Sequence, residues 1–217
     1  IKFKINYRES FYFDEWRIIY RFLRSNNWMK HPKQIKQNER FFIRYFILVL
    51  INTGIRFGEA GKLVWKNIKP VGDNEVRIKL SESQTKNEKE RTVIGRRADV
   101  FEKIRKYSNH TKPNDYVFVN NTTGKQLSRH TYYTNFKYLV EQTKLDNNRE
   151  HTSYYCFRHT YATRRLYAGV DVFSLSRNLG TSVRYIENHY GQTKTELMVK
   201  KLTKDFKTDE SGQFLFD

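Results

Sequence analysis

The chain has 217 residues, of which 41 are Lys or Arg and 23 are Asp or Glu, so its formal net charge is +18. Its single cysteine, Cys156, excludes a disulfide framework or a cysteine-based zinc site and is typical of a reducing compartment. Residues 41–51, the longest apolar run, are interrupted by Arg44 and are too few to span a bilayer, so we expect no membrane partner. The positive charge favours nucleic acid as a partner, although A+T-rich coding would raise the lysine content as well.

Apolar residues that recur at helical spacing predict most of the secondary structure. The predicted helices cover residues 9–24, 39–51, 58–64, 98–107, 128–144, 158–168, 172–179 and 183–190, with a last amphipathic segment around 197–206. After the third of these helices, Val76, Ile78 and Leu80 alternate with basic residues, which is strand periodicity. The polar stretch 81–90 predicts a turn, and residues 91–94 predict the returning strand. We therefore expect a mostly α-helical α+β domain with one small antiparallel sheet.

Three short segments carry a resemblance to a known family. They are Asn52-Thr53-Gly54-Ile55-Arg56-Phe57-Gly58-Glu59, then Thr85-Lys86 in the predicted turn, then Tyr155-Cys156-Phe157-Arg158-His159, which is followed by Leu179-Gly180 and Tyr190. Together they resemble the catalytic domain of the tyrosine recombinase (phage integrase) family, over roughly residues 40–192. Any one segment is weak evidence, whereas three in the right order and spacing are strong evidence.

The resemblance implies attack on a DNA phosphate without a metal ion or another cofactor. Arg56 and Arg158 would hold the non-bridging oxygens of the doubly negative transition state, because a guanidinium stays protonated and offers a planar fork of donors. Lys86 would act as the general acid at the leaving 5′ oxygen, with Lys89 as its rival in the same turn. Tyr190 would be the nucleophile and would form a 3′-phosphotyrosine link.

The choice of Tyr190 among the 15 tyrosines rests on its register. In the family, the nucleophile lies nine positions after a His or Trp that follows Leu-Gly. Here Leu179-Gly180 precedes Thr181, and 190 − 181 = 9. Tyr185 is the nearest competitor, and its spacing does not match.

Two positions depart from the family. Tyr155 stands where the family usually has the first histidine of His-x-x-Arg, and Thr181 stands where it usually has His or Trp. Both hydroxyls can hydrogen-bond a phosphate oxygen, but neither is a good proton shuttle near neutral pH. His159 follows Arg158 but points elsewhere on a helix, so we expect it to be a buried packing partner. Glu59 either orients the first arginine or forms a surface pair of little consequence.

The resemblance predicts a site-specific recombinase or integrase of a phage or other mobile element. It implies action on double-stranded DNA in the cytoplasm of a bacterial or phage-infected cell, as a tetramer and with an accessory DNA-bending protein as a further candidate partner. Two alternatives share the fold, namely a catalytically weakened or silent DNA-binding module and a type IB topoisomerase. A basic RNA-binding domain would explain none of the three segments.

The resemblance also suggests a division of the chain. Residues 1–194 would form the catalytic domain, and residues 195–217 a helix and tail whose apolar stripe docks on its own domain or on a neighbouring protomer. Because the chain begins shortly before the catalytic fold, we expect the family's N-terminal DNA-clamping domain to lie outside it.

Overall fold

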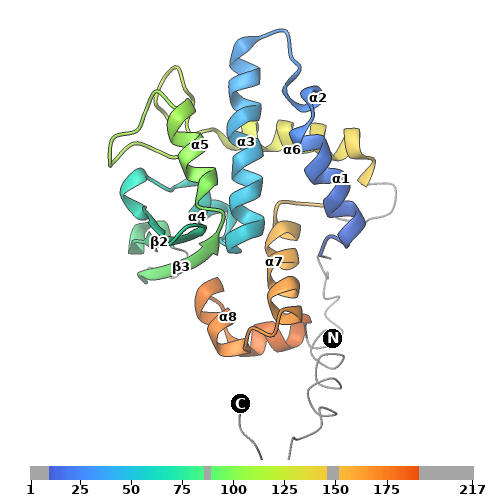
Figure 1. Cartoon of the computed structure of the whole chain (residues 1–217), viewed down its shortest axis with the longest axis vertical. Helices are drawn as coiled ribbons and strands as arrows, with labels where there is room; N and C mark the ends of the chain where they lie inside the picture. Colours follow the sequence, from blue (N-terminus) through green and yellow to red (C-terminus); the bar gives the residue numbers. More distant parts are fainter. Residues whose placement is uncertain (1–9, 86–88, 146–151, 191–217) are drawn as a thin grey trace, which may run out of the picture.

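The computed structural model describes residues 10–85, 89–145 and 152–190 (Figure 1). The elements are α1 (Phe13–Arg24), α2 (Asn26–Met29), α3 (Gln34–Thr53), α4 (Phe57–Gly61), η1 (Trp65–Asn67), β1 (Ile68–Val71), β2 (Glu75–Leu80), η2 (Glu82–Gln84), β3 (Arg91–Arg96), α5 (Asp99–Tyr107), α6 (Arg129–Thr143), α7 (Tyr155–Tyr167) and α8 (Val172–Leu179). Residues 183–190 are also helical. The mostly helical fold with one small antiparallel sheet confirms the predicted fold class. Lys86 and the predicted segment around 197–206 lie outside the described residues.

Helix α3 runs through the centre of the fold (Figure 1) and packs against α5, α6, α7 and β3. It buries 11 of its 20 residues, as an apolar helix enclosed by other elements must. Gly54 caps it in the left-handed conformation, with φ at +67°. A Cβ at this position would lie 2.4 Å from Cδ1 of Tyr161, so the close approach of α7 to the end of α3 requires glycine.

The sheet contains three antiparallel strands in the order β1-β2-β3. The alternation on β2 is confirmed, since Val76, Ile78 and Leu80 are all buried, and Ile78 pairs with Val93 on β3. Strand β1 was not predicted, because three of its four residues are exposed and one of them is Pro70, so its sequence shows no alternation.

The predicted third helix, over residues 58–64, was too long. Helix α4 ends at Gly61, and the chain then extends so that the carbonyl of Leu63 accepts a hydrogen bond from the Val117 amide at 2.9 Å. Helix α7 begins at Tyr155, about one turn earlier than predicted. Within the described part of the chain, no helix is long and apolar enough to cross a membrane.

A second apolar cluster joins α7, α8 and the helical segment 183–190. Its buried members are Tyr161, Ala162, Leu166, Leu175, Leu179, Ile186 and Tyr190. Helix α8 contacts both α7 and β3, and it ends at Gly180 in the left-handed conformation. The carboxyl end of α8 therefore meets the end of α3 and the β2–β3 hairpin, and the candidate site lies at this junction.

Candidate functional site

A cleft of about 690 Å³ opens between the β2–β3 hairpin, the start of α4 and the end of α8. Its basic lining residues are Arg56, Lys79, Lys89, Arg91 and Arg177, and the rest of the lining comprises Thr85, Glu90, Thr92, Gly180, Thr181 and Ser182. A concave surface with five cations and one carboxylate attracts anions. Although Lys86 lies outside the described residues, Thr85 and Lys89 on either side of the undescribed stretch both line this cleft.

Arg56 enters the cleft from the start of α4. Glu59, three residues later, accepts from the Arg56 backbone amide at 3.1 Å and from its Nη1 at 2.9 Å. The Arg56 Nη2 donates to the carbonyl oxygen of Gly180. Glu59 is buried, with a side chain only 3% exposed, so the surface-pair alternative is wrong and the carboxylate orients the guanidinium.

Arg158 lies in the first turn of α7 and is buried rather than exposed to the cleft. Its Nη1 donates to the carbonyl of Gly54 at 2.6 Å, and its Nη2 donates to the carbonyl of Leu179 at 2.7 Å. Burial, assisted by the neighbouring cations Arg56 and Arg91, lowers the pKa of Arg158 to about 10. The group is still a cation at neutral pH, and an anion beside it would relieve this electrostatic cost.

Arg91, at the start of β3, was not singled out by the sequence analysis. Its Nη2 donates to Glu59, and its Nη1 donates to the carbonyl of Asn178. Burial lowers the pKa of Arg91, although Glu59 opposes the shift. The only sequence signal was a basic residue on the strand that returns from the Lys86 turn. Its partners lie 32 and 87 positions away, where no local pattern reveals them.

The three arginines converge on the carboxyl end of α8. Asn178, Leu179 and Gly180 each present a carbonyl to a different guanidinium, namely those of Arg91, Arg158 and Arg56 in that order. The carboxyl end of a helix has orphan carbonyls and partial negative charge, so it gathers cations. With Glu59 as the shared carboxylate, three positive groups and one negative group leave a net charge of +2 at this point.

Tyr190 is the last described residue of the helical segment 183–190 and is only 7% exposed. Its hydroxyl lies 2.5 Å from Nδ1 of His159, which is 6% exposed. Burial raises the pKa of Tyr190 well above its usual value, as does the nearby Tyr185, whereas the positive charge of Arg158 acts in the opposite direction. His159 is buried as expected, but the expectation that it only packs was incomplete, because it bonds the candidate nucleophile.

The other predicted residues occupy different positions. Thr181 lines the cleft, and its amide donates to the carbonyl of Ser176 at 3.0 Å. Tyr155 is 37% exposed at the start of α7, does not line the cleft, and has its ring centroid 6.4 Å from that of His159. Tyr185 is 38% exposed and stacks on His189 at 3.8 Å. Across the residues that the structure describes, no group of three or more His, Cys, Asp or Glu side chains could hold a metal ion.

Comparison with known sequences identifies one matching family. The sequence profile described as the phage integrase family matches residues 21–216, which is most of the chain. No curated protein sequence matched the chain.

Several solved structures share the fold. The site-specific recombinase XerH bound to palindromic difH substrate gives a TM-score of 0.68 at 18% identity, over 91% of this chain and 53% of that chain. The XerA recombinase gives 0.64 at 18% identity, over 91% and 66%. The catalytic domain of bacteriophage HP1 integrase gives 0.55 at 18% identity, over 90% and 95%. The chain thus spans about half the length of XerH and nearly all of the HP1 catalytic domain.

Proposed function

Since this chain belongs to the phage integrase family of tyrosine recombinases, we propose that it cleaves and rejoins duplex DNA at a specific site through a 3′-phosphotyrosine intermediate. The observation that carries the proposal is the cluster of Arg56, Arg91 and Arg158 at the end of α8, with Tyr190 bonded to His159, the residue that follows Arg158. The cluster supplies fixed positive charge, and the tyrosine supplies an oxygen nucleophile.

In the proposed reaction, Tyr190 attacks the scissile phosphorus, and the 5′ oxygen of the next nucleotide leaves. Charge builds on the non-bridging oxygens as the crowded transition state forms. Arg56, which lines the cleft and is already held by Glu59, and the buried Arg158, which is held by the carbonyls of Gly54 and Leu179, stabilise that charge. Lys86 on the hairpin protonates the leaving oxygen. Because the phosphotyrosine keeps the energy of the broken bond, the rejoining step needs no ATP.

The remaining predicted residues serve the same phosphate. We propose that Thr181 donates its hydroxyl to a non-bridging oxygen, since it lines the cleft beside Arg56. Tyr155 contributes a hydrogen bond only after DNA binds, because it is absent from the lining of the cleft. Arg91 anchors the β2–β3 hairpin to Glu59 and to α8, and thereby sets where the Lys86 turn can reach.

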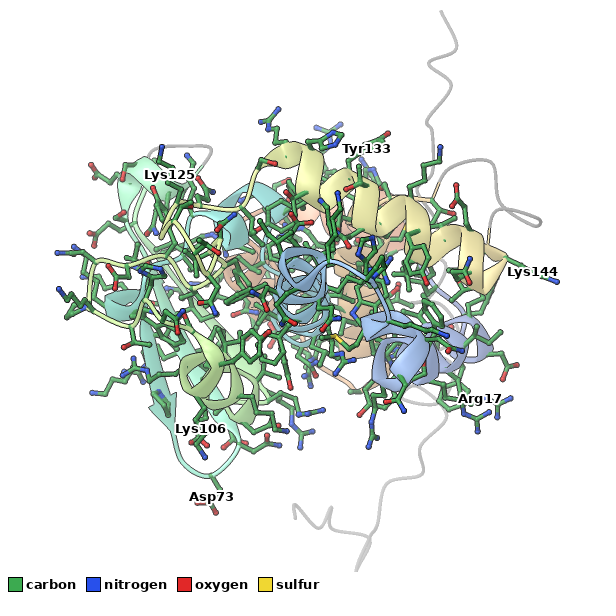
Figure 2. All side chains as sticks on the ribbon, turned by 90° about the horizontal axis from the view of Figure 1, so that it is seen from above. Arg17, Asp73, Lys106, Lys125, Tyr133 and Lys144 are labelled. Atoms are coloured by element: carbon green, nitrogen blue, oxygen red, sulfur yellow. The ribbon has the colours of Figure 1, made fainter. Side chains whose placement is uncertain are left out.

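Duplex DNA is the proposed substrate. The net charge of +18 and the basic cleft support it. Figure 2 shows Arg17, Lys106, Lys125 and Lys144 projecting from the periphery, and none of them lines the cleft, so positive charge is not confined to it. Among the structural neighbours, XerH was solved with its difH substrate and the Tn1549 integrase with circular intermediate DNA. We further propose that residues 1–194 are the catalytic domain, that the tail from 195 docks between protomers of a tetramer, and that an accessory DNA-bending protein can assist.

A catalytically silent DNA-binding module is the second candidate. The burial of Tyr190 against His159 favours it, as do Tyr155 and Thr181 in positions where the family usually has better proton carriers. A silent module would bind the same DNA but would form no covalent bond with it.

One experiment separates these functions. The full chain is incubated with random-sequence duplexes that carry a nick, so that cleavage releases a short strand and traps the adduct. Covalent complexes are then isolated under denaturing conditions, and their DNA is sequenced. A recombinase yields adducts that share one sequence and exchange strands with a second duplex. Sequence-independent adducts that relax plasmid DNA indicate a topoisomerase, and binding without any adduct indicates a silent module.

A further inference from the structure

We propose that His159 is a catalytic residue, which accepts the proton of the Tyr190 hydroxyl as that oxygen attacks the DNA phosphate. The inference rests on the proposed function, because it assigns a general base to the cleavage step. It gives His159 a chemical role in place of the packing role that the sequence alone suggested.

The geometry of the pair meets the first requirement for a general base, which is hydrogen-bond reach of the proton that it removes. The Tyr190 hydroxyl and His159 Nδ1 are 2.5 Å apart. Both side chains are more than nine-tenths buried, so water competes little for this hydrogen bond. The two residues come from segments 31 positions apart in sequence, and the packing of 183–190 against α7 brings them together.

Two consecutive residues of α7 have different roles in the proposed reaction, since Arg158 binds the phosphate and His159 bonds the nucleophile. Successive side chains on a helix point about 100° apart. Arg158 therefore reaches the carbonyls of Gly54 and Leu179, whereas His159 faces Tyr190. One turn of helix holds the cation for the transition state and the base for the nucleophile in a fixed relation to each other.

The buried tyrosine needs such an acceptor. Burial raises the pKa of Tyr190, so direct loss of its proton to water is unfavourable. An imidazole is the side chain whose ordinary pKa best suits proton transfer near neutral pH. His189 is the other histidine beside Tyr190, with ring centroids 6.4 Å apart. Its Nδ1 lies 2.9 Å from the carbonyl of Tyr185 and bonds there, whereas the Tyr190 hydroxyl has its hydrogen bond with His159.

Among the described residues, the charged and titratable groups near the pair are Arg158 and Tyr155 on α7, and Tyr185 and His189 on the segment 183–190. The Arg158 cation opposes an early positive charge on the imidazole and stabilises a developing tyrosinate. The assignment requires the tautomer with its proton on Nε2, so that Nδ1 can accept the bond.

The Tyr190 proton moves to His159 Nδ1 while the phenol oxygen forms a bond to phosphorus. The bond between phosphorus and the 5′ oxygen breaks, and that oxygen takes a proton from the general acid, assigned above to Lys86. In rejoining, the 5′ hydroxyl gives its proton back to Lys86 and attacks the phosphotyrosine, the bond between phosphorus and the phenol oxygen breaks, and His159 returns its proton to that oxygen.

The test separates activation of the nucleophile from protonation of the leaving group. A nicked duplex is synthesised with the sequence that the covalent-capture experiment identifies. It carries sulfur in place of the bridging 5′ oxygen, because a thiolate leaves without a general acid. Single-turnover cleavage is measured from pH 5 to 9 for the full chain and for His159→Asn, which keeps a hydrogen-bonding group near the Nδ1 position but cannot titrate. His189→Asn is the matched control, and Lys86→Ala reports on the acid.

On the sulfur substrate, His159→Asn should lower the cleavage rate by about 100-fold or more, the typical contribution of a general base. Lys86→Ala should regain most of its activity on this substrate, and His189→Asn should stay within about 3-fold of the unaltered chain, because its ring does not accept the proton. The rate of the unaltered chain should rise with pH and level off in the range where imidazoles titrate.

Three results would overturn the assignment. The first is cleavage by His159→Asn at the same rate as the unaltered chain, or faster. The hydrogen bond from His159 would then only hold Tyr190 in place and would not assist its attack. The second is a His159→Asn variant whose rate depends on pH in the same way as that of the unaltered chain, because another group would then be the base. The third, which needs no variant to fold, is an unaltered chain whose rate shows no inflection between pH 5 and 8. No adduct from the unaltered chain on any duplex would instead refute the proposed function itself.

Discussion

Glu59→Gln should destabilise the fold, because one buried carboxylate serves two of the three clustered arginines. Glu59 bonds Arg56 at 2.9 Å and also bonds Arg91, and its side chain is 3% exposed. Removing one partner of a buried ion pair typically costs about 3–5 kcal/mol. The arginine side chains are 18% and 12% exposed and glutamine keeps one acceptor, so we expect about 2–3 kcal/mol.

Urea unfolding of the full chain and of Glu59→Gln measures this difference as a lower midpoint at unchanged slope. Added sulfate should recover part of the loss, since an anion that binds the uncompensated arginines stabilises the folded state. Asp14→Asn is the control, because its pair with Arg17 is exposed and should contribute at most about 0.5 kcal/mol. A loss below about 1 kcal/mol for Glu59→Gln, with no effect of sulfate, would refute this electrostatic account of the cluster.

Three further predictions concern the reaction. Arg56→Ala and Arg158→Ala should each slow cleavage by about 100-fold or more, as expected for a preorganised transition-state donor; equal losses in DNA affinity, measured by titration, would recast them as ordinary phosphate anchors. Cleavage in EDTA should stay within about 2-fold of that in magnesium, because arginines supply the positive charge; a strict magnesium requirement in single-turnover kinetics would contradict this. Thr181→His should speed cleavage at least about 10-fold by adding a stronger donor to the cleft, and an unchanged rate would mean that the pocket is built around threonine.

Local sequence patterns predicted the parts of the fold that depend on local chemistry. The left-handed glycine after α3 and the alternation on β2 both follow from nearest neighbours along the chain. Strand β1 could not be predicted from its own sequence, because its pairing with β2 orders it and its side chains are mostly exposed. Helix α4 was predicted too long, since Leu63 and Val64 leave the helix and pair their backbones with Val117 and Tyr116.

In the candidate site, too, local sequence patterns did not reveal contacts between distant parts of the chain. Arg56, Arg158 and Tyr190 could be selected from their sequence contexts, and the structure gathers them around the end of α8. Arg91 could not, because its role depends on partners that only the folded chain brings near. The burial of His159 was predicted correctly, but its bond to Tyr190 was not, because seven consecutive residues of α7 are buried. A stretch of helix that is buried on all sides carries no amphipathic signal to say which residue faces the site.

The most direct test of the account is to identify the residue that becomes joined to DNA. The full chain is trapped on the nicked duplex, the complex is digested with protease and nuclease, and the remaining nucleotide-bearing peptide is sequenced by mass spectrometry. The account predicts a 3′-phosphate linked to Tyr190, and complete loss of the adduct in Tyr190→Phe with DNA affinity within about 3-fold, because only one oxygen is removed. A linkage to Tyr185 or any other residue, or an adduct that survives in Tyr190→Phe, would contradict it.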